Sequence, residues 1–327
     1  MRKKIRFKKS CFIAIVLLFP FLVTAQQPDT LIKKLDSLKQ NKDTSGQINN
    51  INRANYNENT KITVPVYFTL LVDDIKQQVT APFHLKGKDW LKVGQFALLT
   101  GAVAFADEPL QRSALRLRNR SHAVRTVSRY VTNFGGLYEG YTLAALGAYG
   151  YLFKSEKTKT TTLLATQAYI TAGAIESVLK LLSGRQRPSY YDPNSVEAEP
   201  VFHGPFYKPG DLVNGNKLNS SFPSGHTTVA FAAATVYAME YRDRPLVPII
   251  SYSAATLIGL SRITENKHWA TDVLVGAALG YLCGRQVVNN YHRYAKIQND
   301  KKRAGTLSFQ LQYLNGTLLP GVVYHFR

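Results

Sequence analysis

Apolar stretches rich in Ala, Gly, Leu and Thr recur between about residues 89 and 290, and charged residues are confined to the segments between them. Each stretch is followed by a helix-breaking residue or by a charged turn, which is typical of packed helices. The pattern predicts six helices, at about 89–106, 137–153, 159–183, 224–240, 246–261 and 269–288. We therefore expect an all-α fold, a helical bundle of about six core helices that occupies residues 89–290.

The segment between the first two helices, 107–136, carries six arginines. The solvated face of an amphipathic helix accounts for them. A patch that contacts a membrane surface or steers a charged substrate is the alternative. The pattern alone leaves both interpretations open.

The chain before the core differs in composition. Residues 26–60 are polar and rich in Gln, Asn, Lys and Asp, which indicates a flexible or loosely helical leader. Residues 61–85 hold β-branched and aromatic side chains around Pro65 and predict an extended strap. Residues 26–88 are therefore expected to form a polar leader and an extended strap.

The long segment 189–222 is rich in Pro, Gly, Asn and Tyr, and connections of this length are often functional. Its aromatic side chains and its histidine either form a lid over a ligand or pack the segment onto the bundle. These residues are Tyr190, Tyr191, His203, Phe206 and Tyr207.

The tail, 291–327, is predicted to form a basic linker followed by a β-hairpin. Residues 306–313 alternate in polarity, Asn315-Gly316 is typical of a type I′ turn, and 318–326 is extended. Two strands cannot close a barrel, so the hairpin is expected to be an appendage of the helical core.

Residues 1–25 have the pattern of a secretory signal peptide. A basic start is followed by an apolar run over 12–23 and by the small-residue sequence Val23-Thr24-Ala25. An uncleaved membrane anchor is the alternative, although this run is short for a membrane span. Either interpretation places the protein in the bacterial cell envelope.

The formal net charge of +20 suits an anionic substrate or an anionic lipid surface. Nucleic acid is not expected as a partner, because the chain is predicted to leave the cytoplasm. Of the two cysteines, Cys11 lies in the signal segment and Cys283 is alone in the remainder, so no intrachain disulfide is expected.

The first chemical cluster lies at the end of the predicted helix 159–183. Lys180 and Arg187 are seven residues apart, so they share one face if the helix continues that far. Gly184 and Pro188 indicate a helix end nearby. Basic residues are common in a last helical turn, so this cluster alone is weak evidence for a site.

The second cluster, Ser224-Gly225-His226, precedes an apolar helical run. Ser224 is a natural N-cap, and Gly225 has no side chain to obstruct a ligand. The amide N–H groups of a first helical turn can bind an anion, and His226 lies at that position.

The third cluster places Arg262 before His268 and Asp272, which are four residues apart and share one helix face. A carboxylate there can accept the proton of one imidazole nitrogen, which leaves the other nitrogen as a nucleophile. A purely structural hydrogen bond is the alternative for an isolated His–Asp pair.

Together, the clusters supply three cations, a helix N-terminus and two imidazoles. Phosphoryl transfer needs this combination, because charge on the phosphoryl oxygens must be stabilised. The three clusters contain no paired carboxylates for a metal site, so cationic side chains would replace metal ions.

The combined pattern resembles the signature of the phosphatidic acid phosphatase type 2 and vanadium haloperoxidase superfamily. All three parts occur in order, without departure at any signature position. The matching residues are Lys180, Arg187, Pro188, Pro223, Ser224, Gly225, His226, Ser261, Arg262, His268 and Asp272. The resemblance implies a helical bundle with its site at one end, over about residues 89–290.

The resemblance also implies roles for these residues. Lys180, Arg187 and Arg262 would bind phosphate oxygens, and Ser224 and Gly225 would add hydrogen bonds at the helix start. The same resemblance implies no cofactor, and vanadate would bind as a phosphate mimic.

Three further residues would carry the chemistry. His268 would be the nucleophile that forms a phosphohistidine, and Asp272 would orient it. His226 would protonate the leaving alkoxide and later activate water. The enzyme would therefore be a metal-independent phosphoric monoester hydrolase.

The expected substrate is an anionic phosphorylated molecule, a phosphomonoester or pyrophosphate of a lipid such as phosphatidate, an isoprenoid diphosphate or lipid A. A soluble periplasmic non-specific acid phosphatase is the main alternative. A phosphotransferase, a vanadium haloperoxidase and a non-catalytic anion-binding envelope protein are weaker ones.

Location follows from the number of membrane spans. The candidate helices are rich in small residues, which suits packing in lipid, but several are short for a span. Five spans would place the site in the periplasm and the basic loops in the cytoplasm. We expect an inner-membrane protein with its site facing the periplasm, or a soluble periplasmic bundle.

Overall fold

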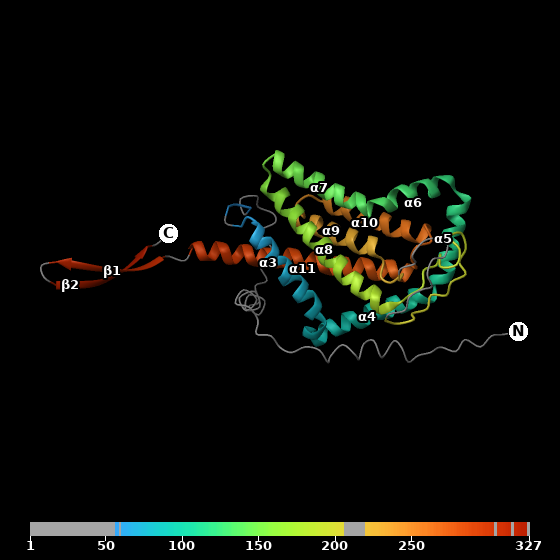
Figure 1. Cartoon of the computed structure of the whole chain (residues 1–327), viewed down its shortest axis with the longest axis horizontal. Coiled ribbons are helices and arrows are strands. Elements are labelled where there is room, and N and C mark those ends of the chain that lie inside the picture. Colours follow the sequence, from blue (N-terminus) through green and yellow to red (C-terminus); the bar gives the residue numbers. More distant parts are fainter. Residues whose placement is uncertain (1–55, 59, 206–219, 304–305, 315–316, 326–327) are drawn as a thin grey trace.

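A computed structural model describes residues 56–58, 60–205, 220–303, 306–314 and 317–325 (Figure 1). The predictions of a signal peptide at 1–25, most of the leader and the turn at Asn315-Gly316 lie outside these residues. The description of side chains extends to residue 298 and leaves out Leu137.

The described residues are mostly helical, which confirms the predicted fold class of a helical bundle. The α-helices are α3 (Val64–Thr80), α4 (Gly87–Phe105), α5 (Asp107–Arg120), α6 (His122–Phe134), α7 (Leu137–Leu152), α8 (Glu156–Ser183), α9 (Gly225–Glu240), α10 (Leu246–Thr264) and α11 (Ala270–Arg303). A short 3-10 helix, η4 (Ala81–His84), joins α3 to α4. Strands β1 (Thr306–Leu314) and β2 (Thr317–His325) follow α11 and pair antiparallel.

The prediction of an extended strap at 61–85 is wrong, because most of this segment is helix α3. Pro65 occupies the first turn, where its missing N–H costs nothing. The helix packs against α8 and α11 and buries Leu70. Such tertiary packing overrides the weak strand preference of β-branched residues.

The arginine-rich segment 107–136 forms two helices, α5 and α6. They meet at Ser121, whose side chain accepts a hydrogen bond from the Val124 N–H and caps α6. Asp107, Gln111 and Leu115, at intervals of four, form the buried side of α5. Five of the six arginines are exposed, as both interpretations of this segment require.

The last helix is longer than predicted. Residues 291–303, expected to be part of a basic linker, continue α11. The cause is an apolar face that persists among the charges, since Val287, Tyr291 and Tyr294 are all buried.

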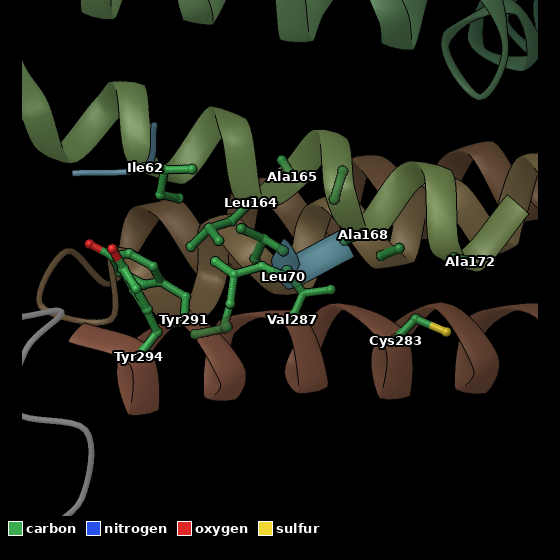
Figure 2. Packing of buried hydrophobic residues seen from close by; sticks show 14 of the residues in the cluster. Ile62, Leu70, Leu164, Ala165, Ala168, Ala172, Cys283, Val287, Tyr291 and Tyr294 are labelled. Carbon is green, nitrogen blue, oxygen red and sulfur yellow. The ribbon is translucent and has the colours of Figure 1, made fainter. Parts of the chain in front are cut away.

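The core cluster lies between α3, α8, α9 and α11. Figure 2 shows Leu164 and Ala168 of α8 facing Val287 and Tyr291 of α11, with Leu70 of α3 beside them. Many of the buried side chains are alanines, which let the helix backbones approach closely.

Three glycines of α11, Gly276, Gly280 and Gly284, form the seam between α11 and α9. They are four residues apart and therefore share one helix face. A Cβ atom on Gly276 would lie 2.8 Å from the backbone oxygen of Ser224, and one on Gly280 would overlap that of Thr228. The absence of side chains therefore lets the start of α9 lie directly on α11.

Replacing Gly280 with alanine is expected to lower stability, because the added methyl group would push against the Thr228 carbonyl. Overpacking of this kind costs about 1–3 kcal/mol. Gly101→Ala, on α4, is the matched control, because a Cβ atom on Gly101 would have no neighbouring atom within 4 Å. Because alanine favours the helix more than glycine does, Gly101→Ala should stabilise the protein by up to about 1 kcal/mol. Thermal unfolding midpoints of the two variants compare the effects, and equal midpoints would contradict this packing.

The up-and-down course of the helices gathers four helix termini at one end of the bundle. The C-termini of α8 and α10 and the N-termini of α9 and α11 meet there, beside the start of α5 (Figure 1). All three sequence clusters therefore lie at the same end.

Candidate active site

Helix α8 ends at Ser183, between the two basic residues of the first cluster. Lys180 lies inside the helix, and Arg187 lies beyond its end. Gly184 ends the helix in the left-handed conformation, with φ 54°. The helix therefore does not continue to Arg187, and the chain itself brings that residue back toward the site. Lys180, in the last turn, forms an ion pair of 2.5 Å with the buried Glu176.

The start of α9 lies beside this ion pair. Ser224 occupies the N-cap position, but its side chain makes no capping hydrogen bond to the backbone and contacts the Thr227 hydroxyl at 2.9 Å. A Cβ atom on Gly225 would lie 2.6 Å from Glu176 Oε1 and 3.3 Å from Lys180 Nζ. Only glycine at 225 therefore leaves that ion pair in place.

His226 packs against the turn between α6 and α7. A Cβ atom on Gly136 would lie 3.1 Å from its Nε2, and one on Gly135 would lie 2.9 Å from its Cβ. This Gly-Gly pair was not among the predicted site residues, although two consecutive glycines between helices indicate a close approach. These glycines make room for the imidazole.

His268 lies in the connection between α10 and α11 and is 1% exposed. Its Nδ1 is 2.7 Å from the backbone oxygen of Ser221. A carbonyl oxygen can only accept, so Nδ1 carries the hydrogen and Nε2 keeps the lone pair. Asp272 lies farther away, with Oδ2 3.7 Å from Nδ1. The expected His–Asp proximity is present, but the nearer acceptor is the Ser221 carbonyl.

The carboxylate of Asp272 is fully buried and held from three sides. Oδ2 accepts from the Ser221 hydroxyl at 2.5 Å and from the Trp269 N–H at 2.9 Å. Oδ1 is 2.5 Å from Nη1 of Arg185. Ser221 therefore contacts both Asp272 and His268, which couples their positions.

Arg185 is a buried site residue that the sequence patterns did not predict. Its guanidinium lies between Asp272 and Asp107, with Nη2 2.7 Å from Asp107 Oδ2. Its Cζ lies 4.7 Å from the ring centroid of Phe202 and 5.8 Å from that of Trp269. Two carboxylates and two rings therefore surround a cation that is 1% exposed.

Asp107 links this network to the first turn of α11. It accepts hydrogen bonds from the N–H and hydroxyl groups of Thr271, at 2.9 Å and 2.5 Å. The start of α5 thus holds the start of α11, and with it the element that carries Asp272.

The third cation of the signature, Arg262, lies in the last turn of α10 and is 8% exposed. Its Nη1 donates to the hydroxyl of Thr132 on α6 at 2.7 Å. Burial, and then the charges of Arg187, Arg262 and Lys180, hold the pKa of His268 well below its usual range. The imidazole therefore stays neutral in mildly acidic solution.

The eight predicted site residues thus meet at one end of the bundle: Lys180, Arg187, Ser224, Gly225, His226, Arg262, His268 and Asp272. In the part of the chain described by the structure, no three His, Cys, Asp or Glu side chains are grouped to hold a metal ion. An anion with several oxygens is the ligand that such a cationic end can bind.

The described part of the segment 189–222 packs onto the bundle. Val196 and Ala198 are buried in a cluster with Leu115 and Trp269. Tyr190 adds to this cluster and makes an edge-to-face contact with Tyr191. The predicted lid residues Phe206 and Tyr207 lie outside the described residues.

The described residues form a helical bundle with cations and two imidazoles gathered at one end. Residues 161–296 match the family model of the PAP2 superfamily, so the chain carries a PAP2 superfamily domain. This match confirms the resemblance drawn from the three clusters.

Among curated proteins, the chain is 47% identical over 87 residues to a lipid A 1-phosphatase of Porphyromonas gingivalis. This aligned stretch covers 23% of this chain and 20% of that protein. The chain is also 31% identical over 150 residues to lipid phosphate phosphatase 1 of Arabidopsis thaliana. That aligned stretch covers 38% of this chain and 44% of that protein. The chain therefore spans less than half the length of these relatives.

Two solved structures cover much of the chain. One is a transmembrane PAP2 type phosphatidylglycerolphosphate phosphatase from Bacillus subtilis, at 21% identity and a TM-score of 0.42, covering 68% of this chain and 94% of that one. The other is LpxE of Aquifex aeolicus, at 24% identity and a TM-score of 0.38, covering 53% and 92%.

Proposed function

We propose that this protein is a phosphatase that hydrolyses a phosphomonoester or pyrophosphate group of a lipid through a phosphohistidine at His268. The observation that carries the proposal is the hydrogen bond of 2.7 Å between His268 Nδ1 and the Ser221 carbonyl. It leaves Nε2 as a lone-pair nucleophile at the cationic end of the bundle.

In the first step, His268 Nε2 attacks phosphorus, a P–N bond forms, and the P–O bond to the leaving group breaks. His226 donates its proton to the departing alkoxide. Lys180, Arg187 and Arg262 stabilise the charge on the phosphoryl oxygens, and the start of α9 adds N–H donors.

In the second step, His226 acts as a general base and removes a proton from water. The water oxygen attacks phosphorus, the P–N bond breaks, and inorganic phosphate leaves. Asp272 keeps its position through Arg185, Ser221 and the Trp269 N–H, and its charge stabilises the imidazole while it is phosphorylated.

A lipid substrate is supported by the names of the relatives, a lipid A 1-phosphatase and a lipid phosphate phosphatase. The exposed apolar surface supports it as well. On α10, Leu246, Ile249 and Ile250 are each more than 60% exposed, and this helix is long and apolar enough to cross a membrane. Contiguous exposed apolar surface of this kind suits contact with lipid.

The proposed orientation places the site on the periplasmic side of the inner membrane. The turn between α7 and α8 carries Lys154, and the turn between α9 and α10 carries Arg242 and Arg244. Both turns lie at the end of the bundle opposite the site, and basic loops favour the cytoplasm. The exposed arginines of α5 and α6 lie nearer the site end, where they can contact anionic headgroups.

The purified protein is expected to hydrolyse phosphatidate, a lipid A-type 1-phosphate or an isoprenyl diphosphate at least about tenfold more efficiently than p-nitrophenyl phosphate, because lipid contacts add binding energy. A chelator should leave the rates unchanged, and vanadate should inhibit. Faster turnover of soluble esters, with release of the protein by osmotic shock, would instead support the non-specific acid phosphatase. No hydrolysis of any phosphate ester would overturn the proposal.

A bell-shaped dependence of kcat/KM on pH is expected, with activity retained well below pH 6.5. Burial and three cations lower the pKa of His268, so Nε2 keeps its lone pair as the solution becomes mildly acidic. His226 must carry a proton when the leaving group departs, but burial and the charges of Arg262, Lys180 and Arg187 lower its pKa to about 3 in the free protein. The general acid is therefore lost from acidic pH upward, and the rate should fall as the pH rises. A profile that is flat between mildly acidic and neutral pH and above would contradict these roles.

A further inference from the structure

An apolar cavity of about 890 Å³ lies between α6, α7, α9 and α10. Its volume falls within the range of small-molecule sites. Along α9 its lining extends from Ala230 to Tyr241. The eleven steps from one residue to the next along this stretch correspond to about 16 Å. The cavity is therefore long enough to hold part of a hydrocarbon chain.

One end of this cavity adjoins the candidate active site. Ala230 lies one helical turn after His226, and Ile258 lines the cavity. A Cβ atom on Gly135 would touch both Ile258 and His226. His226 is the proposed proton donor to the leaving oxygen, so the chain attached to that oxygen begins where the cavity begins.

Glu139 is an unusual member of this apolar lining. It is 7% exposed, and neither carboxyl oxygen has a hydrogen-bond partner among the residues that the structure describes. The phenol of Tyr169 on α8 lies close enough to interact with it electrostatically. Burying a carboxyl group without a hydrogen-bond partner costs free energy, and a ligand that donates a hydrogen bond would remove that cost.

The position of Glu139 shows which part of a ligand it would meet. Its N–H donates to the Gly136 carbonyl at 3.2 Å, and Gly136 adjoins His226 Nε2. Glu139 therefore lies in the first turn of α7, at the end of the cavity nearest His226. The first atoms of a lipid chain that occupies this cavity would lie beside it.

We propose that Glu139 selects lipid phosphates that carry a hydrogen-bond donor, an amide N–H or a hydroxyl group, at the start of the chain. Amide-linked and hydroxylated acyl chains have such a donor, whereas plain ester-linked and isoprenyl chains do not. The proposal rests on the proposed phosphatase function and names the substrate class of the same site.

The test compares ceramide 1-phosphate, which has an amide N–H and a hydroxyl group beside the headgroup, with phosphatidate of matched chain lengths. The wild-type protein should prefer ceramide 1-phosphate by about tenfold in kcat/KM, which corresponds to ~1.4 kcal/mol. Glu139→Leu should reduce the preference to about one. Glu139→Gln should keep it, because the amide oxygen still accepts.

Two further measurements separate this proposal from the proposed function. Ala234→Phe, which fills the cavity from α9, should slow both lipids while hydrolysis of p-nitrophenyl phosphate continues. No preference in the wild-type protein, or an unchanged preference in Glu139→Leu, would overturn the selection by Glu139. If the wild-type protein hydrolysed neither lipid and did not hydrolyse p-nitrophenyl phosphate, the phosphatase function itself would be contradicted.

Discussion

Replacing His268 with alanine is expected to lower kcat for hydrolysis of p-nitrophenyl phosphate by at least about a thousandfold, because it removes the group that attacks phosphorus. The cations would still bind the substrate, so KM should change much less than kcat. Stopped assays with a chelator present, at several substrate concentrations, measure both constants.

The matched control is His292→Ala. His292 is also a buried histidine of the bundle, 5% exposed, and its Nε2 lies 2.6 Å from Glu240 Oε1 on α9. It lies toward the far end of the bundle, so its loss should affect stability and leave kcat nearly unchanged. Similar kcat values for His268→Ala and the wild type would exclude His268 as the nucleophile.

Replacing Arg185 with methionine is expected to cost about 3–5 kcal/mol of stability, because it leaves Asp107 and Asp272 buried without their shared cation. The activity that remains should also fall, by about ten- to a hundredfold in kcat, since Asp272 loses one of its three contacts. Denaturant unfolding and initial rates of the folded fraction measure the two effects.

Two comparison variants sharpen this prediction. Arg185→Lys keeps the charge but cannot bridge two carboxylates with a planar fork, so it should give intermediate values. Arg118→Met removes another arginine of the same region, whose ion pair with Glu265 is longer, at 3.7 Å. It should leave kcat unchanged. A loss of stability in Arg185→Met without any change in kcat or in the pH profile would assign Arg185 a purely structural role.

The helices of the core could be predicted because their apolar stretches are long and are bounded by local signals. The missed helix α3 shows where local reasoning fails, since Pro65 lies in the first turn of that helix and the helix packs against α8 and α11. The same limit applies to the end of α11. Its buried face, with Tyr291 and Tyr294, is interrupted by enough charge to resemble a linker.

The candidate site could be predicted where its residues form short spaced clusters, as His268 and Asp272 do. The residues that hold those clusters could not be predicted, because their contacts join distant parts of the chain. Arg185 reaches Asp107 across 78 positions and Asp272 across 87. Nothing local distinguishes Arg185 from the neighbouring arginine of the signature, and only the folded chain shows that one is buried between carboxylates.

Trapping the phosphorylated protein tests the proposed chemistry most directly. Wild-type protein mixed with a ³²P-labelled lipid phosphate and quenched within one turnover should carry label that is labile to acid and stable to alkali, as a phosphohistidine is. Proteolysis should place this label on the peptide that contains His268, and His268→Ala should carry none. Label that survives acid, or label on a peptide without His268, would contradict a phosphohistidine at this position.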